Sequence, residues 1–237
     1  MFAVLAAALL FGTTGTARAL GPAEASALSV GVARSVVGGT ALALLAFSLA
    51  AAHRRRSSHR PRPTLTWRSL ALMAVTGVAL SLYQPLFFLG TQTNGVAVST
   101  VIALGSAPVL AGILEWALSR RAPSPLWLGA TTLAASGVVL LGIGGGAGTG
   151  GVDGLGLAAA VGAGACFAVI ANAQRRLLTA GWDAFTVVGA MGVGSAVVCA
   201  AVIPFVDLSW IISPPGVLMA LWLGLATIAV AYALFTW

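Results

Sequence analysis

The sequence predicts an all-α integral membrane protein with eight transmembrane helices, arranged as an inverted five-helix repeat whose second copy is incomplete. Three observations predict this fold class: the balance of apolar and charged residues, the length of the apolar runs, and the recurrence of their spacing. Of the 237 residues, 59% are hydrophobic and only 7% are charged, and the mean hydropathy is +1.02. A water-soluble domain of this size could not bury so many apolar residues in one core, so we expect a bilayer to be its solvent.

Helices that cross the hydrocarbon of a bilayer need roughly 17 to 25 mostly apolar residues. The windows that meet this length are residues 1–17, 28–52, 69–90, 95–118, 126–142, 154–173, 185–206 and 216–237. Each should be helical, because a lipid-facing segment must satisfy its own backbone hydrogen bonds and the alternation of a β-barrel is absent. The first window also resembles a signal peptide, since Ala17-Arg18-Ala19 is similar to a cleavage site. No basic residues precede it, so we interpret it as a retained helix.

The arginines predict how the helices are oriented. All twelve basic residues are arginines, and ten of them fall in alternate connections. Those ten are Arg54, Arg55, Arg56, Arg60, Arg62, Arg68, Arg120, Arg121, Arg175 and Arg176. Because connections rich in Lys and Arg stay in the cytoplasm, both chain ends should be cytoplasmic, in the inner (plasma) membrane of a cell. We therefore attribute the net charge of +7 to arginines that set the orientation of the helices and contact membrane lipid, and not to nucleic-acid binding.

The spacing of the apolar windows predicts an internal repeat. Windows that begin at residues 1, 28 and 69 are followed by windows that begin at 154, 185 and 216, with offsets of 153, 157 and 147. A unit of five helices is odd, so its second copy enters the membrane upside down, as in many secondary transporters. We expect the first repeat at 1–142 and an incomplete second repeat at 154–237.

Several short motifs, in their order and spacing, resemble an EamA-type permease of the drug/metabolite transporter superfamily. In the first half these motifs are Phe11-Gly12-Thr13-Thr14, Ala33-Arg34, Leu104-Gly105-Ser106-Ala107-Pro108-Val109, Leu128-Gly129 and Ala135-Ser136-Gly137-Val138-Val139-Leu140. In the second half they are Gly154, Leu223-Gly224-Leu225-Ala226-Thr227 and Ala231-Tyr232. The resemblance implies a transporter and covers nearly the whole chain.

The sequence also departs from the family pattern at two places. The family pattern has Trp-Gly where this chain has Phe11-Gly12, and Gly-Glu-Arg where it has Leu118-Ser119-Arg120-Arg121, which leaves the substrate open. Such permeases usually have ten helices in two inverted repeats, and a copy of the fourth helix would begin near residue 245. The resemblance thus implies that a ninth and a tenth helix are missing. Either the chain is a segment of a longer protein, or it completes itself with a partner, for which a homodimer is an option.

Arg34 is the leading candidate for a substrate-binding residue. It lies about two turns inside its predicted helix, where a charge costs roughly 2.5 kcal/mol or more unless it faces a cavity or a partner. One interpretation is a contact to an anionic group such as a substrate carboxylate. The other is structural: the side chain reaches the outer interface or bonds to helix ends.

A second group of candidates surrounds two prolines, because prolines free backbone carbonyls that are tolerated where they line a cavity. The substrate-binding candidates in this group are Tyr83, Gln84, Phe87, Ser106 and Pro108. Ordinary kinks and packing between helices explain the same residues equally well. Glu115 is the only acidic residue inside a predicted span and is a candidate for ion coupling, but pairing with Arg120 and Arg121 at the cytoplasmic boundary is the favoured interpretation.

These residues favour a secondary transporter of small metabolites, exporting amino acids or related compounds by alternating access. Amino acids are named as the substrate class because of the family resemblance alone. The competing hypothesis is a non-transporting scaffold or receptor that uses the basic loop from His53 to Arg68. An enzyme would need paired carboxylates, a Ser/His pair or metal ligands at membrane depth, and the sequence offers none. We therefore expect no catalytic residue, no metal and no cofactor.

Overall fold

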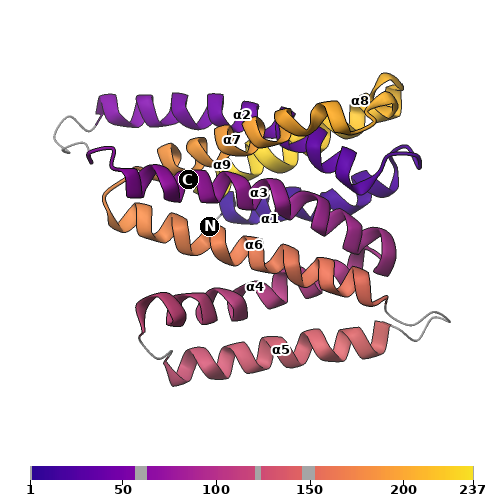
Figure 1. Ribbon diagram of the computed structural model, residues 1–237, viewed down its shortest axis with the longest axis horizontal. Helices are drawn as coiled ribbons and strands as arrows, with labels where there is room; N and C mark the ends of the chain where they lie inside the picture. Colours follow the sequence, from indigo (N-terminus) through magenta and orange to yellow (C-terminus); the bar gives the residue numbers. More distant parts are fainter. Residues whose placement is uncertain (1, 57–62, 121–123, 146–152, 237) are drawn as a thin grey trace.

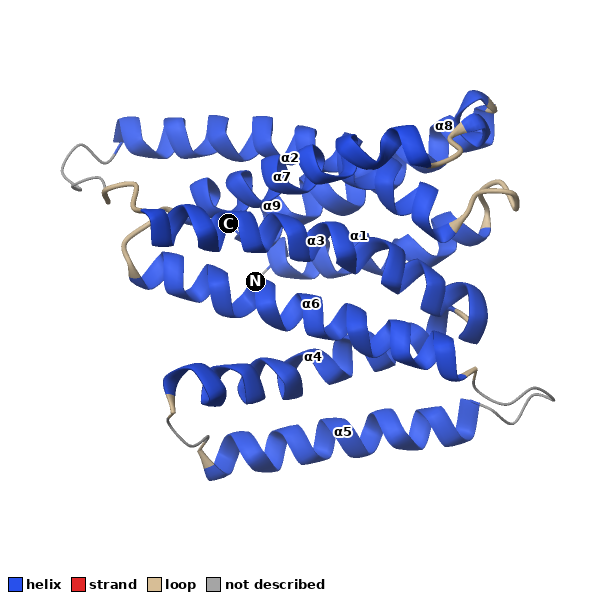
Figure 2. Cartoon of the chain, in the orientation of Figure 1, coloured by secondary structure: helices blue, strands red, loops and turns tan. Residues whose placement is uncertain are grey.

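The computed structural model describes residues 2–56, 63–120, 124–145 and 153–236, and within these ranges it contains helices and loops but no strand (Figure 2). The elements are α1 (Phe2–Ala19), α2 (Ala27–Arg56), α3 (Trp67–Asn94), α4 (Val96–Ser119), α5 (Pro125–Gly145), α6 (Gly154–Thr179), α7 (Ala184–Val202), η1 (Ile203–Phe205), η2 (Ser209–Ile212), α8 (Pro214–Leu221), η3 (Trp222–Val230) and α9 (Ala231–Thr236). Helices occupy every window that the hydropathy predicts.

Seven stretches of the described chain are long and apolar enough to cross a membrane. Six of them are α1, α2, α3, α4, α6 and the combined α7 and η1, and the seventh runs from α8 through η3 to α9. The predicted window at 126–142 is also helical, as α5, and its crossing of the membrane stays a prediction. The chain is therefore a multi-pass membrane protein by length and composition of its helices.

The connection between α3 and α4 is shorter than the sequence suggests. Residues Thr91–Asn94, expected as a loop, continue α3, and a single residue, Gly95, joins it to α4 with a φ of +78°. Residues with a β-carbon rarely adopt this backbone conformation, whereas glycine adopts it at little energetic cost. The two helices therefore form a tight hairpin, in which Ser99 Oγ donates to the Gly90 carbonyl oxygen at 2.6 Å.

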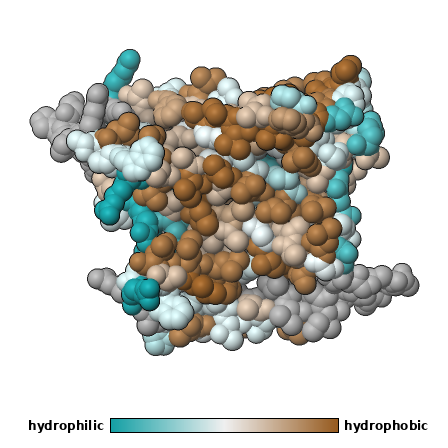
Figure 3. Space-filling model, in the orientation of Figure 1, coloured by the Kyte–Doolittle hydropathy of each residue, from teal (hydrophilic) through white to brown (hydrophobic). Residues whose placement is uncertain are grey.

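The helices lie roughly parallel to one axis, and their connections gather at its two ends (Figure 1). The connections α2–α3, α4–α5 and α6–α7 lie at one end, on the left in Figure 1, and we call it the basic end. The described arginines Arg55, Arg68, Arg120, Arg175 and Arg176 belong to it. Hydrophobic residues cover the middle of the surface in Figure 3, and hydrophilic ones lie toward the two ends.

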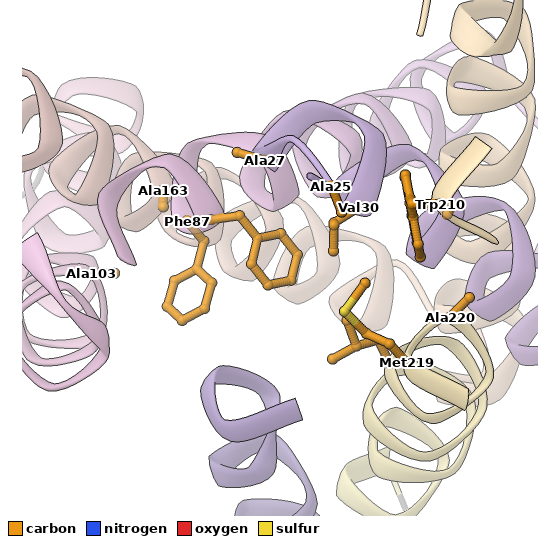
Figure 4. Close-up of a cluster of buried hydrophobic side chains, with 12 residues drawn as sticks. Ala25, Ala27, Val30, Phe87, Ala103, Ala163, Trp210, Met219 and Ala220 are labelled. Carbon is orange, nitrogen blue, oxygen red and sulfur yellow. The ribbon is translucent and has the colours of Figure 1, made fainter. Parts of the chain in front are cut away.

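The core of the bundle is formed by α2, α3, α6 and α7, which pack on one another, while α5 lies at the edge against α4 (Figure 1). One buried cluster joins both halves of the chain. It includes Val30 of α2, Phe87 of α3, Ala163 of α6, and Trp210 and Met219 near the opposite end (Figure 4). The indole nitrogen of Trp210 donates to Ser29 Oγ at 3.0 Å, which ties η2 to the start of α2.

Candidate solute-binding site

Two glycines of α2 place Arg34 at the centre of the site. A β-carbon at Gly31 would lie 3.0 Å from the Pro85 nitrogen, and one at Gly38 would lie 2.7 Å from the Gly224 carbonyl oxygen. Residues three and four apart share one face of a helix, so Gly31, Arg34 and Gly38 face the same side. The two glycines let α2 approach α3 and η3 closely, and Arg34 lies between these contacts.

The guanidinium of Arg34 is bound to neutral groups from two elements, α3 and η3. Nη1 donates to Gln84 Oε1 of α3 at 2.6 Å, Nε donates to the Leu223 carbonyl oxygen at 3.2 Å, and Nη2 donates to Thr227 Oγ1 at 2.9 Å. The guanidinium carbon also lies 5.7 Å from the centre of the Phe88 ring, within range of a cation–π contact. Arg34 is only 3% exposed. It is held inside the bundle and does not reach the interface.

The bonds to Leu223 and Thr227 depend on the irregular helix η3. In a π-helical stretch the backbone hydrogen bonds run from residue i to i+5, and such stretches are frequent at functional sites. The Leu223 carbonyl oxygen accepts from Thr227 Oγ1 at 2.7 Å as well as from Arg34. Arg34 therefore stabilises carbonyl groups that this helix presents inside the bundle.

A cavity of about 280 Å³ opens beside Arg34. Its lining from the first half of the chain is Ala8, Phe11, Gly12, Thr14, Arg34, Tyr83, Gln84, Phe87, Thr100 and Leu104. Its lining from the second half is Phe167 and Tyr232. This volume is at the small end of the range for ligand sites, so the cavity suits a small solute.

Aromatic rings form two groups in the lining of the cavity. Tyr83 stacks on Phe87 with 5.6 Å between ring centres, and Phe167 lies 6.1 Å from Tyr83. In a second pair in the lining, Phe11 and Tyr232 meet edge to face at 5.1 Å. Offset-stacked and edge-to-face rings are favourable packing arrangements that leave apolar faces for a ligand. The site thus combines apolar walls with one cationic group.

No carboxylate of the described chain forms an ion pair with Arg34. The five acidic residues of the sequence are Glu24, Glu115, Asp153, Asp183 and Asp207. Asp153 and Asp183 cap α6 and α7, Glu115 lies at the basic end, and Glu24 and Asp207 lie in connections. A buried charge without a counter-charge is costly, so Arg34 depends on its hydrogen bonds to neutral groups within the described residues.

The structure brings four of the predicted substrate-binding residues together: Arg34, Tyr83, Gln84 and Phe87 all line the cavity. Ser106 and Pro108 do not line it. Ser106 Oγ donates to the Ala103 carbonyl oxygen at 3.3 Å, and it packs where α6 approaches α4 at Gly164. Pro108 is exposed. The cavity-facing residues of α4 are instead Thr100 and Leu104, one turn apart.

Glu115 lies away from the cavity. Its carboxylate pairs with Arg175, and Arg176 Nη2 lies 3.8 Å from Oε2, so its ion-pair partners among the described residues come from α6 and not from Arg120, which caps α4. Arg121 lies outside the described residues. A nearby contact joins the same two helices, because Asn172 Nδ2 donates to the Ala111 carbonyl oxygen at 3.0 Å. Asn172 is buried, and this bond is made across the α4–α6 contact.

Phe167 and Thr227 were not among the sequence candidates. Thr227 was detectable in principle, because it is the only hydroxyl-bearing residue in the apolar run from Gly216 to Ala231. Phe167 gives no such signal, since an aromatic residue in a spanning helix is equally typical of lipid contact or core packing. Only the packing of α6 on α3 places its ring beside Tyr83.

A larger groove of about 1090 Å³ lies between α1 and α8. It is lined mostly by apolar side chains, among them Leu5, Leu9, Leu218 and Met219. Within this lining, Trp222 Nε1 of η3 donates to Thr13 Oγ1 of α1 at 3.0 Å. Its lining holds no charged group, so the smaller cavity around Arg34 is the candidate solute site.

A bundle of apolar spanning helices around a small cavity with a buried cation is typical of multi-pass membrane proteins of the transporter class. The model of the EamA-like transporter family matches residues 1–143. A relative from Bacillus subtilis (strain 168), named "Uncharacterized transporter YwfM", is 35% identical over 232 residues, covering 98% of this chain and 74% of the relative. This chain belongs to the EamA-like transporter family.

One solved crystal structure supports the fold alone. It superposes with a TM-score of 0.65 at 18% sequence identity, and the match covers 99% of this chain and 77% of the other. The resemblance to the drug/metabolite transporter superfamily is therefore confirmed by the family match and the relative. Membership points to a membrane transporter rather than an enzyme.

Proposed function

We propose that this chain is a secondary permease that exports small metabolites, amino acids or related carboxylates, by alternating access. The observation that carries the proposal is Arg34, a buried cation that faces a cavity between aromatic walls and has only neutral partners. A solute carboxylate placed there would supply the counter-charge that the bundle itself does not supply. The proposed setting is the plasma membrane, with both termini in the cytoplasm, because the arginines gather at the basic end.

The position of the cavity supports alternating access. Its lining comes from both proposed repeats, with α1 to α4 on one side and α6 and α9 on the other. Arg34 itself belongs to the first repeat and donates to Leu223 and Thr227 of the second. Rocking of one half against the other would therefore change the hydrogen bonds of Arg34. An anion bound to Arg34 would then shift the equilibrium between the two arrangements of the halves.

Close glycine contacts support the inverted repeat. A β-carbon at Gly39 would lie 2.6 Å from the Gly192 carbonyl oxygen, and one at Gly192 would lie 2.7 Å from that of Gly39. Such reciprocity between α2 and α7 is expected of equivalent elements at a two-fold axis. The contact of Gly77 with Gly194 likewise has a counterpart in the contact of Gly224 with Gly38, and Gly77 and Gly224 are separated by the repeat offset of 147.

The groove beside α1 fits the same proposal. The helix α4 of the first half packs against α3 of the same half and against α6 of the second half. Under the inverted repeat, the equivalent of α4 would pack against α1 and the segment from α8 to α9. The groove of about 1090 Å³ lies between α1 and α8, at that position. Its apolar lining is what a spanning helix would need.

The test is solute counterflow in proteoliposomes. Vesicles with the purified chain are loaded with one unlabelled carboxylate metabolite or amino acid at a time and diluted into trace amounts of the same labelled solute. We expect transient accumulation of label for at least one class of carboxylate and none in vesicles without protein. Arg34→Gln should abolish it, while Arg68→Gln, which removes the same charge from an exposed position in α3, should not.

The proposal fails if a folded wild-type sample moves none of the solutes. It also fails if Arg34→Gln, reconstituted at equal density, accumulates label as the wild type does.

A further inference from the structure

We propose that the cavity selects apolar organic monocarboxylates that carry no ammonium group. The inference rests on the proposed function and narrows it for the same site: among the carboxylates proposed there, it favours those without an ammonium group over amino acids. The first observation is the charge inside the cavity. Arg34 is 3% exposed, and its hydrogen-bond acceptors among the described residues are an amide oxygen, a hydroxyl and backbone carbonyls, none of which carries a charge.

The remaining lining adds no second charge. Its other polar side chains are the amide of Gln84 and the hydroxyls of Thr14, Tyr83, Thr100 and Tyr232, all of which are neutral at physiological pH. A bound monoanion would make the site neutral. A zwitterion would leave one positive charge in excess, and a cation would leave two. In a poorly solvated cavity these differences are large enough to rank the three solute types in that order.

Arg34 also has one N–H group that is available to a ligand. Nη1 carries two N–H groups, and one donates to Gln84 Oε1. The second has no acceptor among the described residues, so a carboxylate oxygen could accept it without displacing Gln84. Charge-assisted hydrogen bonds of this kind are about twice as strong as neutral ones. The ammonium group of an amino acid would find no carboxylate in the lining.

The body of the solute is defined by the walls. The rings of Tyr83 and Phe167, and those of Phe11 and Tyr232, line a cavity of about 280 Å³. Aromatic faces favour apolar and aromatic bodies, and this volume favours a compact one. The class that fits is a small aromatic or branched acid, including amino acids whose amine has been removed or acylated.

The test uses four probes with one phenyl ring and different charges. They are hydrocinnamate, its neutral amide, phenylalanine, which differs from hydrocinnamate by an α-ammonium group, and phenethylamine. Dissociation constants are measured from the ligand-dependent melting temperature of the purified full chain. We expect hydrocinnamate to bind roughly 10- to 100-fold more tightly than the amide or phenylalanine, the size of a hydrogen bond to a charged group. Phenethylamine should not bind.

Variants assign the preference to Arg34. Arg34→Gln should reduce hydrocinnamate to the affinity of its amide, whereas Arg68→Gln should leave both affinities unchanged. If Arg34→Gln does not fold, Arg34→Lys keeps the charge and should keep the preference for the anion over the amide.

Two results overturn the inference. If phenylalanine binds as tightly as hydrocinnamate while counterflow moves amino acids, the charge selection is wrong and the proposed function stands. If no probe binds and counterflow moves no solute, both proposals fail.

Discussion

Arg34 of α2 donates from Nη1 to Gln84 Oε1 of α3 at 2.6 Å. A fully buried cation is thus oriented by a neutral amide and not by a carboxylate. Replacing that amide by an acid of the same shape would neutralise Arg34 from within the protein. The pair therefore decides whether the cavity needs an anion from outside.

Gln84→Glu should weaken anion binding and keep the fold. The new carboxylate would pair with Arg34 at the same distance, and the melting temperature should stay equal or rise because the buried charge gains a partner. The affinity for hydrocinnamate should fall at least about tenfold. Gln84→Met is the control: it removes the acceptor without adding charge, and we expect it to destabilise the protein by about 1–3 kcal/mol while anion binding persists. Tight anion binding by Gln84→Glu would contradict the proposed role of Arg34.

Gly38→Ala should destabilise the bundle. Its β-carbon would lie 2.7 Å from the Gly224 carbonyl oxygen, so α2 and η3 must separate, at a cost of about 1–3 kcal/mol. The same shift would move Arg34 away from Leu223 and Thr227, so transport should decrease too. The matched control is Gly129→Ala in α5, where nothing lies within 4 Å and the gain in helix propensity is about 0.5–1 kcal/mol. Equal melting temperatures for the two variants would show that the close approach is not required.

Glu115→Gln should have a small effect. The carboxylate and Arg175 are partly solvent-exposed, at 32% and 61% of their side-chain area, so their ion pair is worth about 0–1 kcal/mol. Because Glu115 lies at the basic end and outside the cavity, any dependence of transport on a pH gradient should be unchanged. Counterflow and gradient-driven uptake are compared in the same vesicles. Loss of the pH dependence alone would instead make Glu115 the coupling residue.

Cysteine labelling tests the proposed orientation. Cys166 and Cys199 are first replaced by alanine, and a single cysteine is then placed at Ser124, at the basic end, or at Asp207, at the opposite end. Both positions are exposed. In intact cells an impermeant maleimide should label Asp207→Cys and not Ser124→Cys. The reverse pattern would place the termini outside the cytoplasm.

The positions of the helices follow from the sequence because hydropathy is a local property. Each predicted window coincides with a helix, and most ends differ by a few residues, as at α6, which continues to Thr179. The tight turn at Gly95 was not predicted, because a glycine between two helices does not by itself show how few residues join them. The π-helical form of η3 left no local signal in the sequence.

The candidate site was only partly predictable. Arg34 is evident because a charge in an apolar run is costly, and Gln84 because it is polar beside Pro85. Ser106 and Pro108 were chosen for their residue types, although Ser106 lies six residues after Thr100 and so faces another side of α4. Leu223 and Thr227 are about 190 residues from Arg34, and their contact depends on how the two halves pack. No single-sequence pattern reports that packing.

The most direct test of the central claim, that solute binds in the cavity beside Arg34, is protection of a cysteine in its wall. In a background without Cys166 and Cys199, Thr100→Cys is alkylated with a small maleimide in the presence of increasing hydrocinnamate, with Ser124→Cys as the exposed control. We predict that hydrocinnamate slows alkylation of Thr100→Cys in a saturable manner, leaves Ser124→Cys unaffected, and loses its effect when Arg34→Gln is added. Alkylation of Thr100→Cys at one rate with and without hydrocinnamate, in protein that binds it by thermal shift, would place the solute elsewhere and contradict the account.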